Sequence, residues 1–189
     1  MTVRRRIAAV AALAGLALFA FVAAAGAGPT RLKTFGTGEV TTAGTSATIV
    51  IDVGEASGVF TGGSRGKLLG DSVFSFTSRG DVAGGAPRFS IPINDGAFDA
   101  NTDYAFIDAA GCGANVGDNP GNVATLVSTQ NPACHVNFHG TDYANWTIFA
   151  QSNPTFRVAK GWTPFIIADA VPPSQTSATY VVTDVFFGG

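Results

Sequence analysis

The chain has 189 residues, of which 46% are hydrophobic and 13% charged, and its formal net charge is −2. Arg4, Arg5 and Arg6 supply three of its eleven basic residues, so eight basic residues face thirteen acidic ones in the remainder, a formal charge of −5. This surplus of negative charge disfavours nucleic acids and anionic membrane surfaces as partners. The length predicts one domain with a sizeable core, which we place at residues 28–189.

The N-terminal end has the order of a secretory signal peptide. The three arginines precede an apolar run from Ile7 to Ala25, and small residues follow. This order predicts a signal peptide over residues 1–27 with cleavage after Ala27, although cleavage after Ala25 fits nearly as well. The apolar run approaches the roughly 20 residues that cross a bilayer, so an uncleaved anchor is the alternative. We expect a secreted or cell-surface protein with no membrane span after cleavage.

The hydrophobic pattern after this segment has a period of two far more often than a helical period. It predicts strands over nine segments, 47–53, 74–77, 88–94, 104–109, 123–128, 134–139, 156–159, 165–168 and 179–187. Together they predict an all-β fold, an antiparallel β-sandwich of jelly-roll or immunoglobulin-like type. Pro92 should put its strand at an edge or a bulge because proline has no backbone N–H. The glycine-rich stretches 54–70 and 111–121 are expected to be loops.

One segment has helical spacing instead. Tyr143, Trp146 and Phe149 recur every third residue, which predicts a short helix over 141–152 that packs on a sheet. Pro154 would terminate it. The shared face of the three aromatic residues favours a core position for Trp146.

The two cysteines, Cys112 and Cys134, lie 22 positions apart. Export would carry them to an oxidising compartment, where such a pair usually forms a disulfide. A reactive free pair is the alternative. We therefore predict a single disulfide that closes the loop between them.

Three oxygen-bearing side chains alternate at Asp99, Asn101 and Asp103, as at the start of a calcium-binding loop. The pattern then departs from the helix-loop-helix type, because Tyr104 stands where a glycine is needed and Ala110 where a glutamate closes the loop. A structural calcium ion is one interpretation of this acidic segment. The other is a solvated hairpin loop without metal. The sequence indicates no other cofactor.

The two histidines, His135 and His139, alternate with Asn137 along one predicted strand. Four positions along a strand span roughly 13 Å, too far for both imidazoles to bind one metal ion. The three polar side chains should share one strand face. That face contacts either a ligand or, as is usual for such positions, solvent.

Trp162 lies in a turn between Lys160 and Pro164, where its indole is expected to be exposed. An exposed indole in an exported sandwich domain can stack on a sugar ring. Trp162 is therefore our first candidate for a ligand contact.

The run 133–149, followed by Asn153-Pro154 and by 165–169, resembles uncharacterised exported proteins of high-GC bacteria. The resemblance implies export and assigns no activity and no functional residue.

Three functions fit these observations. The leading one is a non-enzymatic binding or cell-envelope module, with polysaccharide as the candidate ligand. The second is a small secreted hydrolase that uses aspartates on one sheet face, although Asp52, Asp108, Asp169 and Asp184 each fit strand or strand-end positions. The third is a structural protein of a surface layer that associates with itself. The sequence does not decide whether the protein is an enzyme.

Overall fold

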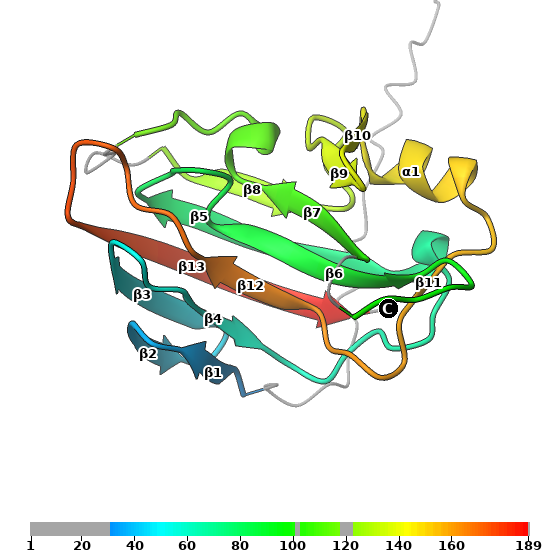
Figure 1. Ribbon diagram of the computed structural model, residues 1–189, viewed down its shortest axis with the longest axis horizontal. Coiled ribbons are helices and arrows are strands. Elements are labelled where there is room, and N and C mark those ends of the chain that lie inside the picture. The colour runs from blue at the N-terminus through cyan, green and yellow to red at the C-terminus, as the bar shows by residue number, and fades with distance from the viewer. Residues whose placement is uncertain (1–30, 101–102, 118–122, 189) are drawn as a thin grey trace, which may run out of the picture.

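The computed structural model describes residues 31–100, 103–117 and 123–188. The predicted signal peptide with both cleavage sites, and Asn101 of the calcium hypothesis, lie outside these residues. The described chain forms two antiparallel sheets with one α-helix (Figure 1). The predicted all-β sandwich is confirmed.

The larger sheet has eight strands in the order β1-β4-β12-β6-β7-β9-β10, and β11 pairs with the end of β6. Its strands are β1 (Lys33–Gly36), β4 (Ser57–Phe60), β6 (Arg88–Asn94), β7 (Tyr104–Asp108), β9 (Val136–Phe138), β10 (Thr141–Tyr143), β11 (Arg157–Val158) and β12 (Phe165–Ala168). Because all its pairs are antiparallel, directly opposed residues share a face of the sheet.

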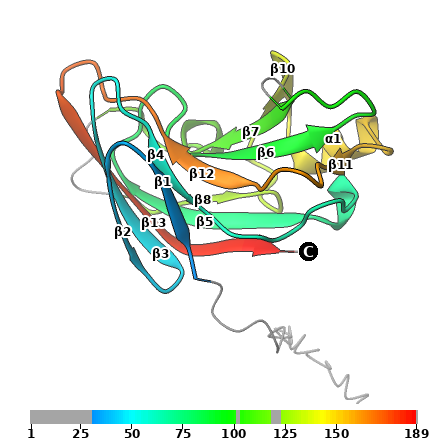
Figure 2. The same cartoon turned by 60° about the horizontal axis from the view of Figure 1, so that its bottom comes forward.

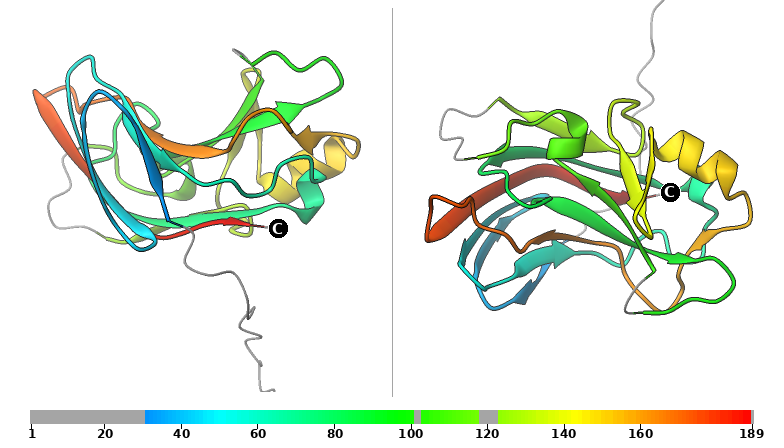
Figure 3. Two further views of the ribbon diagram at one scale, coloured as in Figure 1. Left: turned by 90° about the horizontal axis from the view of Figure 1, so that it is seen from below. Right: turned by 45° about the horizontal axis from the view of Figure 1, so that its top comes forward.

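The smaller sheet has five strands in the order β2-β3-β13-β5-β8. These are β2 (Glu39–Ala43), β3 (Ser46–Asp52), β5 (Val73–Gly80), β8 (Thr125–Ser128) and β13 (Ser177–Gly188). The helices are α1 (Trp146–Ser152) and two short 3₁₀ turns, η1 (Leu69–Asp71) and η2 (Ala110–Cys112). Figures 2 and 3 show β12, β6 and β7 in one layer and β13 and β5 in the other.

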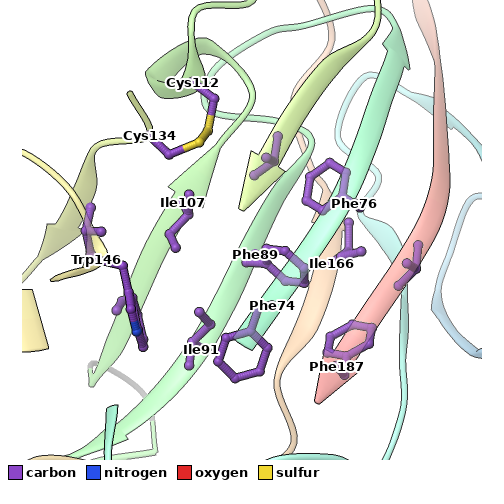
Figure 4. Close-up of a cluster of buried hydrophobic side chains, with 14 of the residues drawn as sticks. Phe74, Phe76, Phe89, Ile91, Ile107, Cys112, Cys134, Trp146, Ile166 and Phe187 are labelled. Atoms are coloured by element: carbon purple, nitrogen blue, oxygen red, sulfur yellow. A yellow bond between two sulfur atoms is a disulfide. The ribbon is translucent and has the colours of Figure 1, made fainter. Parts of the chain in front are cut away.

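Alternate side chains of the two sheets meet in the core. Phe89 of the larger sheet lies 4.9 Å from Phe76 and 5.4 Å from Phe187 of the smaller one, measured between ring centroids (Figure 4). Trp146 closes one end of this core, where its indole N–H donates to the carbonyl oxygen of Leu69 at 2.9 Å. The core position expected for Trp146 is confirmed.

The predicted helix begins too early. Residues 141–143 form strand β10, and α1 starts at Trp146, where the Asn145 side chain accepts a hydrogen bond from the Ile148 N–H. The reason is a two-residue turn at His139 and Gly140, whose φ angles of 51° and 75° make a tight hairpin between β9 and β10. Residues 141–143 therefore pair with β9 as a strand, although the aromatic residues at every third position favour a helix there.

The prediction for Pro92 was also wrong in part, because β6 lies inside the sheet between β12 and β7. Proline is tolerated there because β12 pairs with β6 only as far as Ser90, whereas β11 pairs with it from Ile93. The missing N–H thus falls at the junction of two partners, where the Pro92 carbonyl still accepts from the Ala159 N–H.

Strands β1, β2 and β4 were not predicted, and β4 lies inside the segment 54–70 that was expected to be a loop.

Candidate functional site

A row of directly opposed residues crosses the outer face of the larger sheet. It runs over six strands, through Phe60, Phe165, Ser90, Phe106, Asn137 and Asp142. Side chains of these strands that point the other way, such as Phe89 and Ile107, are fully buried in the core. The row therefore faces away from the smaller sheet.

Five aromatic side chains on this face form what we call the aromatic band, namely Phe35, Phe60, Phe165, Tyr104 and Phe106. Neighbouring ring centroids are 5.3 to 6.4 Å apart, and each ring is partly exposed. Gly58 makes this arrangement possible, because a Cβ atom there would lie 2.7 Å from the Phe35 ring. A contiguous apolar surface of this kind is typical of a binding site.

The band ends in a depression of about 470 Å³ that we call the acidic pocket. It is lined by Gly84, Gly85, Arg88, Phe106, Asp108, Asn137, Asp142, Asp169 and Ala170. Three carboxylates and one guanidinium give these side chains a formal charge of −2. Such a pocket favours a neutral or cationic group over an anionic one.

Hydrogen bonds hold the polar side chains of the acidic pocket in place. Arg88 donates to both carboxylate oxygens of Asp169, at 2.6 and 2.5 Å, and its guanidinium lies 5.2 Å from the centre of the Phe106 ring. Asn137 donates to Asp142 at 2.7 Å. Asp108 accepts from the backbone N–H of Gly111 at 2.6 Å. The pocket thus presents one aromatic ring among planar polar groups of fixed orientation.

The structure does not bring the predicted trio of polar side chains onto one strand face. Asn137 lies in the acidic pocket, but His139 occupies the β9–β10 turn, where its Nε2 lies 2.7 Å from Asp103 Oδ1 and its ring stacks on Phe138. His135 precedes β9 and is exposed. Ligand binding by the two histidines stays a prediction.

Trp162 lies in a second depression, which we call the Trp162 groove, and its side chain is 46% exposed as expected. The groove measures about 490 Å³. It is lined by Gly66, Asn94, Phe98, Arg157, Val158, Ala159, Lys160, Gly161 and Trp162. Asn94, which pairs with Arg157 of β11, is the last residue of strand β6, and Arg88, which lines the acidic pocket, is the first. The Trp162 groove and the acidic pocket therefore lie at opposite ends of β6.

Of the candidate calcium ligands, Asp103 is engaged by the protein itself. Asp103 is buried, and its carboxylate accepts from the backbone N–H of Asp99 and contacts His139. Among the described residues, no group of three or more His, Cys, Asp or Glu side chains could hold a metal ion. Since Asn101 is not among them, the calcium interpretation stays a prediction.

The four aspartates of the hydrolase hypothesis lie in two regions. Asp108 and Asp169 both line the acidic pocket. Asp52 ends strand β3, and Asp184 sits with a φ of 54° in a bulge of β13, so both belong to the smaller sheet. A catalytic pair would have to come from the acidic pocket.

A larger depression of about 600 Å³ lies beside η1 and α1. Its lining consists mainly of uncharged residues, with Asp71 as the one charged side chain, and the Trp146 N–H there is already bonded to Leu69. The outer face of the larger sheet combines aromatic, cationic and carboxylate groups and is the better candidate site.

Fold and site together define a β-sandwich protein whose larger sheet carries an aromatic and polar outer face. A disulfide joins Cys112 to Cys134, as predicted. Comparison of the chain with protein-family models, with curated proteins and with solved structures found no match. No helix in the described parts of the chain is long and apolar enough to cross a membrane.

Proposed function

We propose that this protein is an exported, non-enzymatic module that binds polysaccharide on the outer face of its larger sheet. One observation carries the proposal: the Phe106 ring lies among Arg88, Asn137 and Asp169 at the end of the aromatic band. Export is supported by the signal-like N-terminal sequence and by the disulfide, which is typical of oxidising compartments.

The chemistry of sugars fits this arrangement. A sugar ring offers C–H groups on its faces, which pack on aromatic rings, and hydroxyl groups at its edge, which donate and accept hydrogen bonds. Carboxylate, amide and guanidinium groups around Phe106 supply acceptors and donors in fixed planes. The aromatic band beyond the acidic pocket adds apolar area for further sugar units of a chain.

Calorimetric titration of the full chain, purified after export, with bacterial cell-wall and plant polysaccharides tests this proposal. Phe106→Ala should weaken binding at least about tenfold, a loss near 1.4 kcal/mol. Phe186→Ala is the matched control, because Phe186 is exposed on the smaller sheet. Absence of heat with every glycan, or equal loss in both variants, contradicts the proposal.

The second candidate is a hydrolase, which is supported by the presence of Asp108 and Asp169 in one pocket. Hydrolysis by two carboxylates would then depend on both residues. Asp108→Asn and Asp169→Asn should each abolish turnover of a glycoside and ester panel, with Asp52→Asn as the control. No turnover by the unchanged protein, or turnover that survives both changes, dismisses this candidate.

Self-association in a surface layer would bury the aromatic band against another copy. Light scattering over a range of concentrations separates this alternative from glycan binding. A monomer at every concentration argues against it.

A further inference from the structure

We infer that the Trp162 groove binds an acidic group of the polysaccharide, so that the ligand is an anionic polysaccharide carrying carboxylate, sulfate or phosphate substituents. The inference rests on the proposed polysaccharide-binding function and names the class of glycan. The acidic pocket would hold a neutral or amino sugar of the same chain.

The first support is the charge of the Trp162 groove. Arg157 and Lys160 line it, and Arg65 and Lys67 lie on the segment that pairs with β11 next to it. Within residues 31–100, 103–117 and 123–188, none of these four cations has a carboxylate partner within 4.0 Å. Four cations that have no carboxylate partner among the described residues therefore gather in a domain whose formal charge is −5. Charge of this sign attracts anions to the groove.

The second support is that the cations are positioned by the backbone around them. The Gly66 N–H donates to the carbonyl of Val158 at 2.7 Å, and Arg157 donates to the Gly66 carbonyl at 3.2 Å. Arg65 donates to the Thr163 hydroxyl. These bonds tie the two segments together along the groove.

Gly66 also makes room for Lys160. Its φ of +76° suits glycine, and a Cβ atom there would lie 2.9 Å from Lys160 Cε. The lysine stem therefore lies across the bare backbone of Gly66. This contact accompanies the position of Lys160 in the lining of the Trp162 groove.

The third support is the position of the Trp162 groove relative to the acidic pocket. Arg88, Ser90, Pro92 and Asn94 alternate along the outer face of β6, and Arg88 lines the acidic pocket whereas Asn94 lines the groove. Six residues of antiparallel strand span about 20 Å.

Two members of the aromatic band, Phe106 and Tyr104, lie between the two sites. Phe106 is opposed to Ser90 and Tyr104 to Pro92, so both rings lie along the middle of β6. Figure 1 shows β11 at one end of β6 and the β5–β6 connection at the other. One extended surface therefore joins a pocket of negative charge to a groove of positive charge. A ligand that uses both must be a polymer, with its acidic group at the Trp162 end.

Two soluble polymers of one backbone test the inference, carboxymethyl cellulose as the anionic probe and hydroxyethyl cellulose as the neutral one, with alginate as a second anionic probe. Binding of each to the full chain is measured by calorimetry at low and high salt. The test variant combines Arg157→Gln and Lys160→Gln in one chain. Glutamine keeps a hydrogen-bond donor at each position but removes both positive charges. Arg31→Gln with Arg79→Gln changes the net charge equally and is the control, because both arginines are exposed and neither lines the groove.

We expect an anionic polymer to bind at least about tenfold more tightly than the neutral one at low salt, with the preference falling as salt rises. The Arg157/Lys160 pair should remove that preference and leave the affinity for the neutral polymer unchanged, and the control pair should retain the preference. Unchanged melting temperatures of both variant pairs show that folding is intact.

Other outcomes separate the two proposals. Equal affinity for charged and neutral polymers, or a preference that survives the Arg157/Lys160 change, overturns the inference while glycan binding stands. In a further outcome, Phe106→Ala loses all binding, whereas the Arg157/Lys160 variant still prefers the anionic polymer as strongly as the unchanged protein. This outcome also overturns the inference alone. No binding of any polysaccharide in the wider panel refutes glycan binding and the inference together.

Discussion

The guanidinium of Arg88 and the carboxylate of Asp169 meet in two parallel hydrogen bonds, of 2.6 and 2.5 Å, although the residues lie 81 positions apart. Arg88 starts strand β6 and Asp169 follows strand β12. Their side chains are 19% and 27% exposed, so the pair is mostly buried but still reaches solvent. It fixes both planar groups beside the Phe106 ring.

Arg88→Lys tests the importance of this geometry for binding. Lysine keeps the positive charge but cannot form two parallel bonds to one carboxylate. We expect glycan affinity to fall at least about tenfold, while the free energy of unfolding changes by no more than about 1 kcal/mol because the pair is partly exposed. Calorimetric titration and denaturant unfolding measure the two quantities. Unchanged affinity in Arg88→Lys shows that the paired geometry is not needed.

The two tryptophans should differ sharply in their effect on stability. Trp146 is buried, so Trp146→Ala should lower the free energy of unfolding by about 3–5 kcal/mol. Trp146→Phe, which loses the hydrogen bond to Leu69, replaces it if the alanine variant does not fold. Trp162 is 46% exposed, and Trp162→Ala should change the free energy of unfolding by less than about 0.5 kcal/mol. Denaturant unfolding compares them. Similar losses in Trp162→Ala and Trp146→Phe count against this assignment.

Reduction of the disulfide should destabilise the fold. Cys112 and Cys134 close a loop with a sequence separation of 22, which in the chain-entropy model stabilises the folded state by about 3 kcal/mol. Unfolding with and without a reductant measures the difference. The variant with both cysteines changed to alanine should match the reduced protein and be insensitive to reductant. Equal stability with and without reductant excludes a stabilising disulfide.

The calcium interpretation of Asp99, Asn101 and Asp103 is tested by melting the protein with millimolar calcium and with a chelator. Because the Asp103 carboxylate already accepts from the Asp99 N–H and contacts His139, we expect equal melting temperatures. A rise with calcium that disappears in Asp99→Asn would establish a metal site in this loop. Magnesium at the same concentration controls for ionic strength.

The stability of the fold should decline at alkaline pH through Tyr180. Burial, followed by the negative charges of Asp81 and Asp169, raises the pKa of the Tyr180 phenol, whose hydroxyl donates to the Ala170 carbonyl. The phenol loses its proton more readily in the unfolded chain, near pH 10, so its contribution is complete below about pH 10 and is lost as the pH rises further.

Tyr180→Phe is the variant for this effect. We expect it to cost about 1 kcal/mol at neutral pH, because the Ala170 carbonyl loses its partner, and to make the decline above pH 10 shallower. Denaturant unfolding between pH 7 and 11 measures both changes. An identical alkaline decline in the variant would assign it to other groups. Tyr143→Phe is the control, since Tyr143 is partly exposed and packs on Phe149 of α1.

The aromatic part of the outer-face site escaped sequence analysis for a physical reason, whereas Asn137, Asp108 and Asp169 of the acidic pocket were candidates of separate hypotheses. In the strand 104–108, Tyr104 and Phe106 alternate with Ala105 and Ile107, so both faces are apolar. Alternation separates the two faces but does not say which one turns inward. The acidic pocket is harder still to find, because Arg88, Asp108 and Asp169 come from three separate segments that only strand pairing brings together.

The sequence by itself determined the β-sandwich class, the disulfide, and the contrast between buried Trp146 and exposed Trp162. Each of these follows from local periodicity, from cysteine chemistry, or from a turn signal within a few residues. Tertiary structure decided the start of α1, the interior place of Pro92, and the gathering of the pocket side chains. These depend on which strands pair and in which register. Such contacts join segments far apart in the sequence, so neighbouring residues do not predict them.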